Sequence, residues 1–154
     1  MISICETKDH ELIGGLYEEV QNLHHHLHPE LFKPFNRAGI TAVLRGYLTN
    51  DDCRAYVALV NGEQAGCIVL FVREKKESAF SYPVRSIYID QISVLEKYRR
   101  SGVAKLLLQM AETLADELSI KRIELDHWSA NTIAASYFRK RGYSIYREML
   151  FKTM

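Results

Sequence analysis

The sequence predicts an α/β domain of the mixed α+β kind, with the element order β-α-α-β-β-β-α-β-α-β. The middle of the chain reads as an antiparallel hairpin closed at Asn61-Gly62, a pair typical of type I′ turns. A strand then leads through a short turn into a long helix, whose apolar residues recur every three or four positions up to Leu118. Another strand and helix follow. An antiparallel first half is thus joined to a βαβ-like second half.

Length and composition indicate one globular domain, residues 1–154. The chain has 154 residues, 47% of them apolar and 25% charged, which argues against disorder. Its net charge is only +1, so nucleic acid is not an expected partner. The three cysteines match no metal or redox motif and are expected to be reduced.

No targeting or membrane segment is expected. Glu6 interrupts the apolar N-terminus too early for a signal peptide. The longest apolar run, residues 67–72, is far too short to cross a bilayer. We therefore expect a cytoplasmic protein without a membrane partner.

The N-terminal third is predicted as a strand and two helices. Residues 2–6 alternate as a short strand, and Asp9 caps a helix that runs to about Leu27. A second helix covers residues 37–48. Between them, the proline-punctuated loop 28–35 carries two exposed-looking aromatic residues and reads equally as a substrate lid or as a linker. The apolar stripe expected to face inward is Leu12, Leu16, Val20, Leu23 and Leu27.

A histidine cluster ends the first helix. His24 and His28 are four residues apart on one helical face, which suggests a metal site. No acidic or cysteine ligand stands at a suitable spacing, however, and cationic histidine also suits a helix C-terminus. We therefore predict no metal, and a polar helix end beside a cleft.

The remaining elements follow from alternation and turn chemistry. The hairpin strands cover residues 54–59 and 64–72, and a charged connection leads to the strand at 87–94. The long helix is followed by a strand at 122–127 and a helix at 131–141. Gly142 is expected to cap that helix, and residues 143–151 form a final strand.

The turn after the 87–94 strand carries positive charge at a helix start. Arg99 and Arg100 precede it and Lys105 follows, around Ser101-Gly102-Val103-Ala104. The N–H dipoles already make this end positive, so each cation costs a few tenths of a kcal/mol unless an anion binds. Small residues with free N–H groups favour phosphate. The alternative is an ordinary strand–turn–helix with solvated arginines.

The spacing Arg99-x-x-Gly102-x-Ala104 after a strand resembles the pyrophosphate-binding signature of the GNAT acetyltransferases, which use acetyl-coenzyme A. Tyr88 to Val94 and Tyr98-Arg99-Arg100 resemble that family's central strand and turn. The likeness covers roughly residues 84–152 well, and the N-terminal half only by element order. Further matches to the family's last helix are Asn131, Ala134, Tyr137, Phe138, Gly142 and Tyr143.

This resemblance implies acetyl-CoA as co-substrate, and no metal. The pyrophosphate would lie on the N–H groups from Arg100 to Ala104, and the pantetheine arm would enter a gap between residues 90–95 and 123–128. A backbone N–H near residues 92–94 would polarise the thioester carbonyl. The predicted cofactor-binding residues are Ile92, Ser93, Val94, Arg99, Arg100, Ser101, Gly102, Val103, Ala104, Asn131 and Phe138.

Two residues are the catalytic candidates. Asp90 stands where many family members place Glu and could accept a proton from the amine, or could instead pair with a nearby cation. Asp126 and His127 are weaker candidates for the base. Phe138 occupies the position where the family often has a Tyr that protonates the thiolate. Tyr137 is therefore expected to be mainly a packing residue, and to be the acid only if the helix register is shifted.

Three functions fit these features. The first is an N-acetyltransferase that moves an acetyl group to an amine of a small molecule or peptide, in a ternary complex. The second is an acyl-CoA-binding sensor or inactive domain of the same fold. The third, a nucleotide-binding module, is weakest because no Lys-Ser or Lys-Thr pair follows Gly102. A homodimer is left open.

Overall fold

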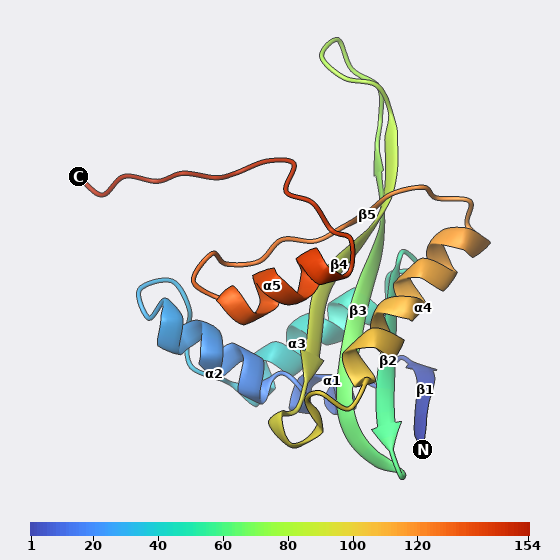
Figure 1. Ribbon diagram of the computed structural model, residues 1–154, viewed down its shortest axis with the longest axis vertical. Coiled ribbons are helices and arrows are strands. Elements are labelled where there is room, and N and C mark those ends of the chain that lie inside the picture. The colour runs from blue at the N-terminus through green and yellow to red at the C-terminus, as the bar shows by residue number, and fades with distance from the viewer.

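The computed structural model describes residues 1–154 as a five-stranded sheet in the order β1-β2-β3-β4-β5 (Figure 1). Neighbouring strands from β1 to β4 are antiparallel, and β5 is parallel to β4. The strands are β1 Ile2–Thr7, β2 Cys53–Val60, β3 Glu63–Lys75, β4 Val84–Val94 and β5 Ile123–Glu124.

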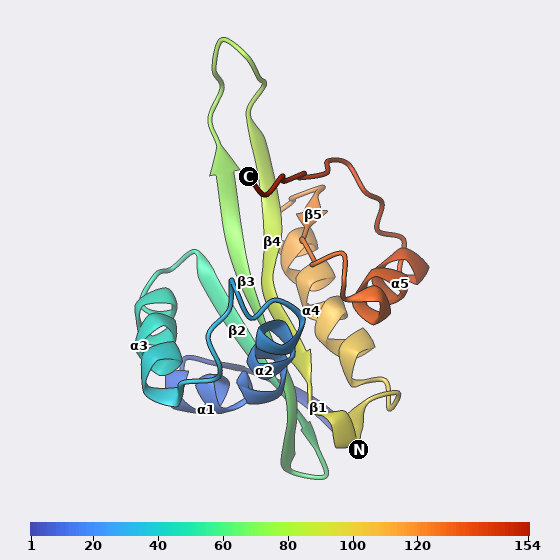
Figure 2. The same cartoon turned by 90° about the vertical axis from the view of Figure 1, so that its left-hand side faces the viewer.

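Helices cover both faces of the sheet (Figures 1 and 2). One face carries α1 and α3, and the other carries α4 and α5, while a short 3₁₀ turn connects β4 to α4. None of these helices combines the length and the apolar character that a membrane span needs. The helices are α1 His10–Gly15, α2 Glu18–Leu27, α3 Arg37–Leu48, α4 Val103–Glu117 and α5 Thr132–Lys140, and the 3₁₀ turn is Glu96–Tyr98.

Strand alternation divides the apolar residues between two cores. In β2, Tyr56 and Ala58 face the larger core under α4, whereas Ala55 and Val57 face the smaller core under α1 and α3. Cys53 and Cys67 are buried in that smaller core. The central strands are therefore covered on both sides and form a rigid platform for β4.

The predicted elements of the middle of the chain are confirmed. The hairpin turns at Asn61 and Gly62, which both have positive φ (50° and 85°), as a type I′ turn requires. Gly142 (φ 90°) follows α5, and the N–H of Tyr143 donates to the carbonyl of Phe138, which is a Schellman cap.

The single helix predicted from Asp9 to Leu27 is wrong, because the chain breaks into α1 and α2 after Gly15. Gly14 lies so close to α3 that a Cβ there would be 2.6 Å from the Thr41 hydroxyl oxygen. The glycine pair lets α1 dock on α3 and α2 leave in a new direction. As a result α2 buries no residue fully, and Leu23 is 37% exposed rather than inward.

The prediction of a final strand at 143–151 is also wrong. Residues 143–154 contain no helix or strand and lead away from the body (Figure 1). The strand expected at 122–127 shrinks to Ile123–Glu124. Both differences lie at the same edge of the sheet.

Candidate active site

A β-bulge in β4 puts Asp90 out of register. Val69 and Leu70 are adjacent in β3, but their partners in β4 are Gln91 and Ile89. Asp90 is therefore the extra residue and has no partner in β3. A bulge of this kind re-aims a side chain while the flanking strand continues.

The Asp90 carboxylate is half-buried among polar groups of several elements. Burial raises the pKa of Asp90, the neighbouring Asp126 raises it further, and Arg73 of β3 opposes the shift. Asp90 in turn helps raise the pKa of Tyr17 and Tyr47, for which burial is the first cause. A carboxylate with a raised pKa is a stronger base than an ordinary aspartate.

Three side chains, from β3, β4 and the segment after β5, converge beside Asp90. The Tyr88 hydroxyl donates a hydrogen bond to Oδ2 of Asp126 at 2.9 Å. The guanidinium carbon of Arg73 lies 3.3 Å from the centre of the Tyr88 ring. Burial and the bond to Asp126 raise the pKa of Tyr88 to about 12. Asp126, the weaker candidate for the base, is thus already a hydrogen-bond acceptor.

The β4–β5 pairing is much shorter than β4 itself. Only Ile87 with Ile123 and Tyr88 with Glu124 are paired, while β4 continues to Val94. The edge of β4 from Ile89 onward therefore has no strand beside it. The backbone N–H and C=O groups along this edge need hydrogen-bond partners. The unpaired edge overlaps residues 90–95, beside which the family resemblance implies a gap. Within this stretch Ser93 is buried, and its hydroxyl donates to the Leu16 carbonyl at 3.1 Å.

The turn into α4 carries a run of free backbone donors. Among all hydrogen bonds of the molecule, none uses the N–H groups of residues 100–105 as donors. Arg100 (φ 59°) and Gly102 (φ 92°) both have left-handed backbone, and Gly102 is the residue before the first helical turn. Six successive N–H groups at a helix start with basic side chains favour an anion. Arg100 and Lys105 form no ion pair.

Arg99 helps to hold this turn in place. Its Nε donates to the Val94 carbonyl at 3.3 Å, and its Nη2 lies 3.7 Å from Oε2 of Glu19. Glu19 of α2 also accepts the N–H of Glu96 at 2.8 Å. Arg99 is therefore partly occupied within the protein, and its direct contact with a cofactor stays a prediction.

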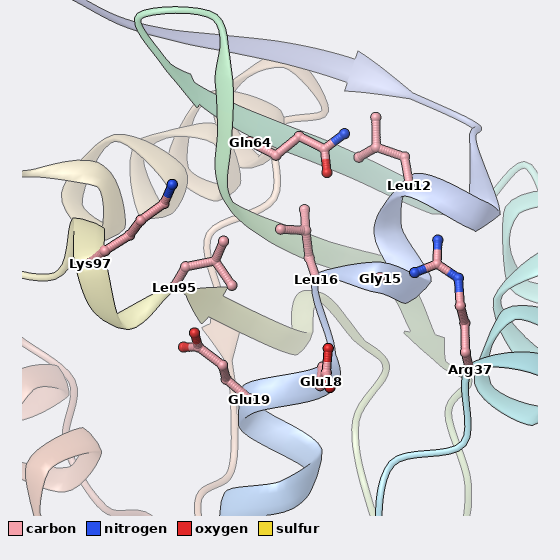
Figure 3. A pocket seen from close by; sticks show the side chains of 9 residues that line it. All are labelled: Leu12, Gly15, Leu16, Glu18, Glu19, Arg37, Gln64, Leu95 and Lys97. Carbon is pink, nitrogen blue, oxygen red and sulfur yellow. The ribbon is translucent and has the colours of Figure 1, made fainter.

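A hollow of about 420 Å³ lies beside this network, at the α1–α2 junction (Figure 3). In Figure 3, Lys97 and Arg37 lie on opposite sides of it, and Glu18 and Glu19 lie below, between them. None of the predicted site residues lines it, and Lys97 is paired with Glu63 at 2.9 Å. We assign it no role in catalysis.

A second hollow, of about 270 Å³, opens between α4 and the end of α5. Its basic lining residues are Lys105, Lys140 and Arg141, opposed only by Glu112. Lys105 belongs to both this hollow and the start of α4. A basic surface therefore continues from the turn towards α5.

The predicted site residues in and next to α5 mainly cap the helix or pack in the core. Asn131 caps the helix, with its Oδ1 accepting the Ala134 N–H at 3.2 Å. Phe138 is 7% exposed and packs in the larger core, so its contact with a cofactor stays a prediction. Tyr137 packs against that core, and its hydroxyl is buried without a hydrogen-bond partner.

Aromatic rings join α2 to the segment after β5. Phe32 lies 5.0 Å from His24 and 5.1 Å from Trp128, and His28 lies 4.9 Å from Trp128, all between ring centres. Burial, and then His28, lower the pKa of His24. Across the whole chain, no group of three or more His, Cys, Asp or Glu side chains could hold a metal ion.

The loop after α2 is less exposed than its sequence suggested. Phe32 and Phe35 are half-buried rather than exposed. Phe35 donates its N–H to Asn22, and the Lys33 carbonyl accepts from Gln21, so α2 holds the loop. Together with Trp128, this loop covers one side of the molecule near the end of β5. The rings of His24, His28, Phe32 and Trp128 are called the aromatic wall below.

The sequence did not reveal several residues around Asp90. Tyr17, Tyr47 and Arg73 come from three distant segments, and nothing in their local pattern indicates a site. One signal was available, because the apolar alternation at Ile87 and Ile89 resumes at Ile92, which is a slip of one residue. That slip predicts the bulge at Asp90.

Comparison with known proteins agrees with this geometry. The family model described as the acetyltransferase (GNAT) family matches residues 20–143. No curated protein sequence matched the chain. Among solved structures, a mutant of the BH1408 protein from Bacillus halodurans has a TM-score of 0.89 at 15% identity, covering 100% of this chain and 99% of that one.

Two further structures have the same fold. The aminoglycoside N-acetyltransferase AAC(6')-Iy, solved in complex with CoA, has a TM-score of 0.75 at 18% identity, covering 100% of this chain and 95% of its own. The ribosomal-protein-alanine N-acetyltransferase from Brucella melitensis biovar Abortus 2308 has a TM-score of 0.69 at 13% identity, covering 99% of this chain and 100% of its own. The structures match in fold, and the family model spans most of the sequence: the chain belongs to the acetyltransferase (GNAT) family.

Proposed function

We propose that this protein is an N-acetyltransferase that moves the acetyl group of acetyl-CoA to a primary amine of a small molecule or peptide. The observation that carries the proposal is the run of six free N–H groups at residues 100–105, next to the unpaired edge of β4. The first feature suits a pyrophosphate and the second a pantetheine arm, which has amides that can pair with a strand edge. Membership of the GNAT family supports both assignments.

The two basic regions suggest how the cofactor would be held. The turn at residues 100–105 would bind the pyrophosphate, and the hollow with Lys105, Lys140 and Arg141 would receive the phosphorylated adenosine end. The chain from Ile89 to Val94 would then run beside the thioester arm. Asp90, at the bulge, would lie at the reactive end.

The reaction needs a neutral amine. With a pKa of about 10.4, roughly one alkylamine in 2,500 is neutral at pH 7, so a base or a water chain must take the proton. Asp90 is the proposed acceptor of that proton, because its environment raises its pKa. The amine nitrogen bonds to the acetyl carbon, the carbon–sulfur bond breaks, and coenzyme A leaves as a thiolate.

The acceptor would enter from the side of the aromatic wall. This wall is formed by α2, the loop after it and the segment after β5, through His24, His28, Phe32 and Trp128. Tyr17 has a buried hydroxyl without a hydrogen-bond partner. Asp90 and Asp126 give the interior of this region negative charge. A cationic amine attached to an apolar or flat group suits these surroundings.

One observation favours the second candidate, an acyl-CoA-binding domain without turnover. Phe138 is a core residue and has no proton for the leaving thiolate. A thiol with a pKa of about 8.5 leaves with modest help, however, so the loss slows the reaction rather than forbidding it. The test is to incubate the protein with acetyl-CoA and a panel of amines and follow free thiol. Thiol release that requires both an amine and the protein supports the transferase. Tight acetyl-CoA binding with no release for any amine supports the binding domain.

A further inference from the structure

Helix α2 belongs to neither hydrophobic core. None of its residues is fully buried, and none from Glu18 to Leu27 is among the apolar side chains that form or flank the two cores. Three of its polar side chains bond only to the loop at residues 32–35, which follows the helix. A helix with so few buried contacts has a low local stability, so the few contacts that it makes decide its position.

Glu19 is the only residue of α2 whose side chain hydrogen-bonds or ion-pairs with a segment other than that loop. Its Oε2 atom accepts the N–H of Glu96 at 2.8 Å and lies 3.7 Å from Nη2 of Arg99. Arg99 in turn donates from Nε to the Val94 carbonyl at 3.3 Å. One carboxylate thus ties the first turn of α2 to the end of β4 and to the segment that leads into residues 100–105.

The other end of α2 carries part of the aromatic wall, since His24 lies in its last turn and His28 follows it. The helix has 10 residues, so it is about 15 Å long. Just before it, the Leu16 carbonyl accepts from the Ser93 hydroxyl, which fixes where α2 begins. Glu19, three residues further on, then fixes the direction in which α2 runs towards the wall.

We infer that Glu19 is a positioning residue, which holds the aromatic wall in place relative to the turn at residues 100–105. The inference rests on the proposed function, which takes the turn as the cofactor site and the wall as the acceptor side. An anion at the turn would neutralise the cations around it and fix the segment to which Glu19 is bonded. The wall is then set for the amine when the cofactor is bound, although Glu19 touches neither substrate.

The contacts of Glu19 are suited to positioning rather than to holding the fold together. The side chains of Glu19 and Arg99 are 40% and 51% exposed. A pair this exposed adds little to the stability of a protein. Replacing Glu19 should therefore leave the chain folded, so that a change at the wall reports the lost link and not unfolding.

Trp128 is the only tryptophan of the chain, so its fluorescence reports on the wall without knowledge of the acceptor. The probe is 3′-phosphoadenosine 5′-diphosphate, the nucleotide of coenzyme A without the pantetheine arm, which would reach the turn but not the wall. At saturation it should change the Trp128 fluorescence of the wild type. In Glu19→Ala this change should fall about fivefold or more, while the Kd of the nucleotide, by calorimetry, stays within about threefold.

Glu18→Ala is the matched control, because it removes the same charge from the same helical turn. Glu18 forms no ion pair, and in Figure 3 the carboxylate of Glu19, not that of Glu18, lies beside Leu95. Its fluorescence change should equal that of the wild type. Glu19→Gln should fall between the two, since its amide oxygen can still accept the Glu96 N–H but no longer pairs with Arg99.

The possible failures are distinct. A fluorescence change that survives in Glu19→Ala would mean that the signal passes through α5, whose capping residue Asn131 donates its N–H to the Trp128 carbonyl at 2.8 Å. That result, or nucleotide binding to the wild type without any fluorescence change, would overturn the inference and leave the proposed function standing. A wild type that does not bind the nucleotide would overturn the pyrophosphate assignment, and the inference with it.

Discussion

Ile89 and Ile92 are three residues apart in β4, yet both pack against the core under α4, because Asp90 is an extra residue between them. In a regular strand a spacing of three would put them on opposite faces. The extra residue leaves Asp90 outside the β3–β4 ladder, on the side of Tyr17 and Tyr47. The bulge thus marks the position of the proposed base.

Asp90→Asn should remove the proposed base. We expect kcat to fall about 10²-fold or more, with acetyl-CoA affinity unchanged, since the carboxylate acts on the acceptor. In the wild type, the rate should fall on the acid side as pH drops through the raised pKa of Asp90, and this limb should be absent from the variant. Normal turnover in Asp90→Asn would leave Asp90 with a structural role only.

The same substitution should stabilise the fold at neutral pH. Because the pKa of Asp90 is raised above 3.8, the folded chain holds this proton more tightly than the unfolded chain. Stability from this group is therefore complete at low pH and lost as pH rises through the folded pKa. Urea midpoints should be higher for Asp90→Asn than for the wild type at pH 7, and should converge towards pH 4. A lower midpoint at pH 7 would argue that Asp90 is ion-paired.

Gly66→Ala should destabilise the sheet at the end of β4. A Cβ at Gly66 would lie 2.4 Å from the carbonyl oxygen of Ser93, a backbone atom that cannot move alone. We expect a loss of about 1–3 kcal/mol in the free energy of unfolding. Gly46→Ala is the control, since that helical position has open space and should gain about 0.5–1 kcal/mol. Denaturant unfolding measures both, and an unaffected Gly66→Ala would show that the strands can separate there.

Tyr137→Phe should leave kcat within about threefold. The Tyr137 hydroxyl is buried without a partner, so its removal should also leave the unfolding free energy unchanged or slightly higher. The reverse change, Phe138→Tyr, should lower stability by about 1–3 kcal/mol, because Phe138 lies in the core. A hundredfold drop of kcat in Tyr137→Phe, with acetyl-CoA binding intact, would identify Tyr137 as the acid.

Trp128→Ala should weaken the binding of the acceptor amine rather than the binding of acetyl-CoA. Trp128 lies between His28 and Phe32, on the side opposite the turn that begins α4 in the proposed arrangement. We expect KM for the best amine of the panel to rise at least fivefold, while the Kd of acetyl-CoA stays within twofold. Steady-state kinetics and calorimetry give the two values. A changed Kd for acetyl-CoA with an unchanged KM for the amine would show that Trp128 acts in cofactor binding instead.

Local signals in the sequence were sufficient to predict most elements of the fold. The hairpin at Asn61-Gly62, the strand at 87–94 and the turn at Gly102 depend on φ preferences and on apolar period, which a single segment carries. The break at Gly14-Gly15 depends on contact with α3, 22 residues or more along the chain, and could not be predicted from the local sequence. The strand expected at residues 143–151 is absent, because an alternating pattern does not by itself supply the neighbouring strand that it must pair with.

The central claim is that the turn at residues 100–105 binds the pyrophosphate, and a comparison of two glycines tests it most directly. Gly62 and Gly102 have nearly the same φ (85° and 92°), and a Cβ at either would meet no atom within 4 Å. Valine at either site should therefore carry a similar backbone penalty, of order 1–3 kcal/mol.

Only Gly102 lies where the anion is proposed to bind. Calorimetric titration of acetyl-CoA should show at least tenfold weaker binding for Gly102→Val than for the wild type. Gly62→Val should bind within twofold of the wild type, at a temperature where both variants are folded. Equal affinities for Gly62→Val and Gly102→Val would contradict the account.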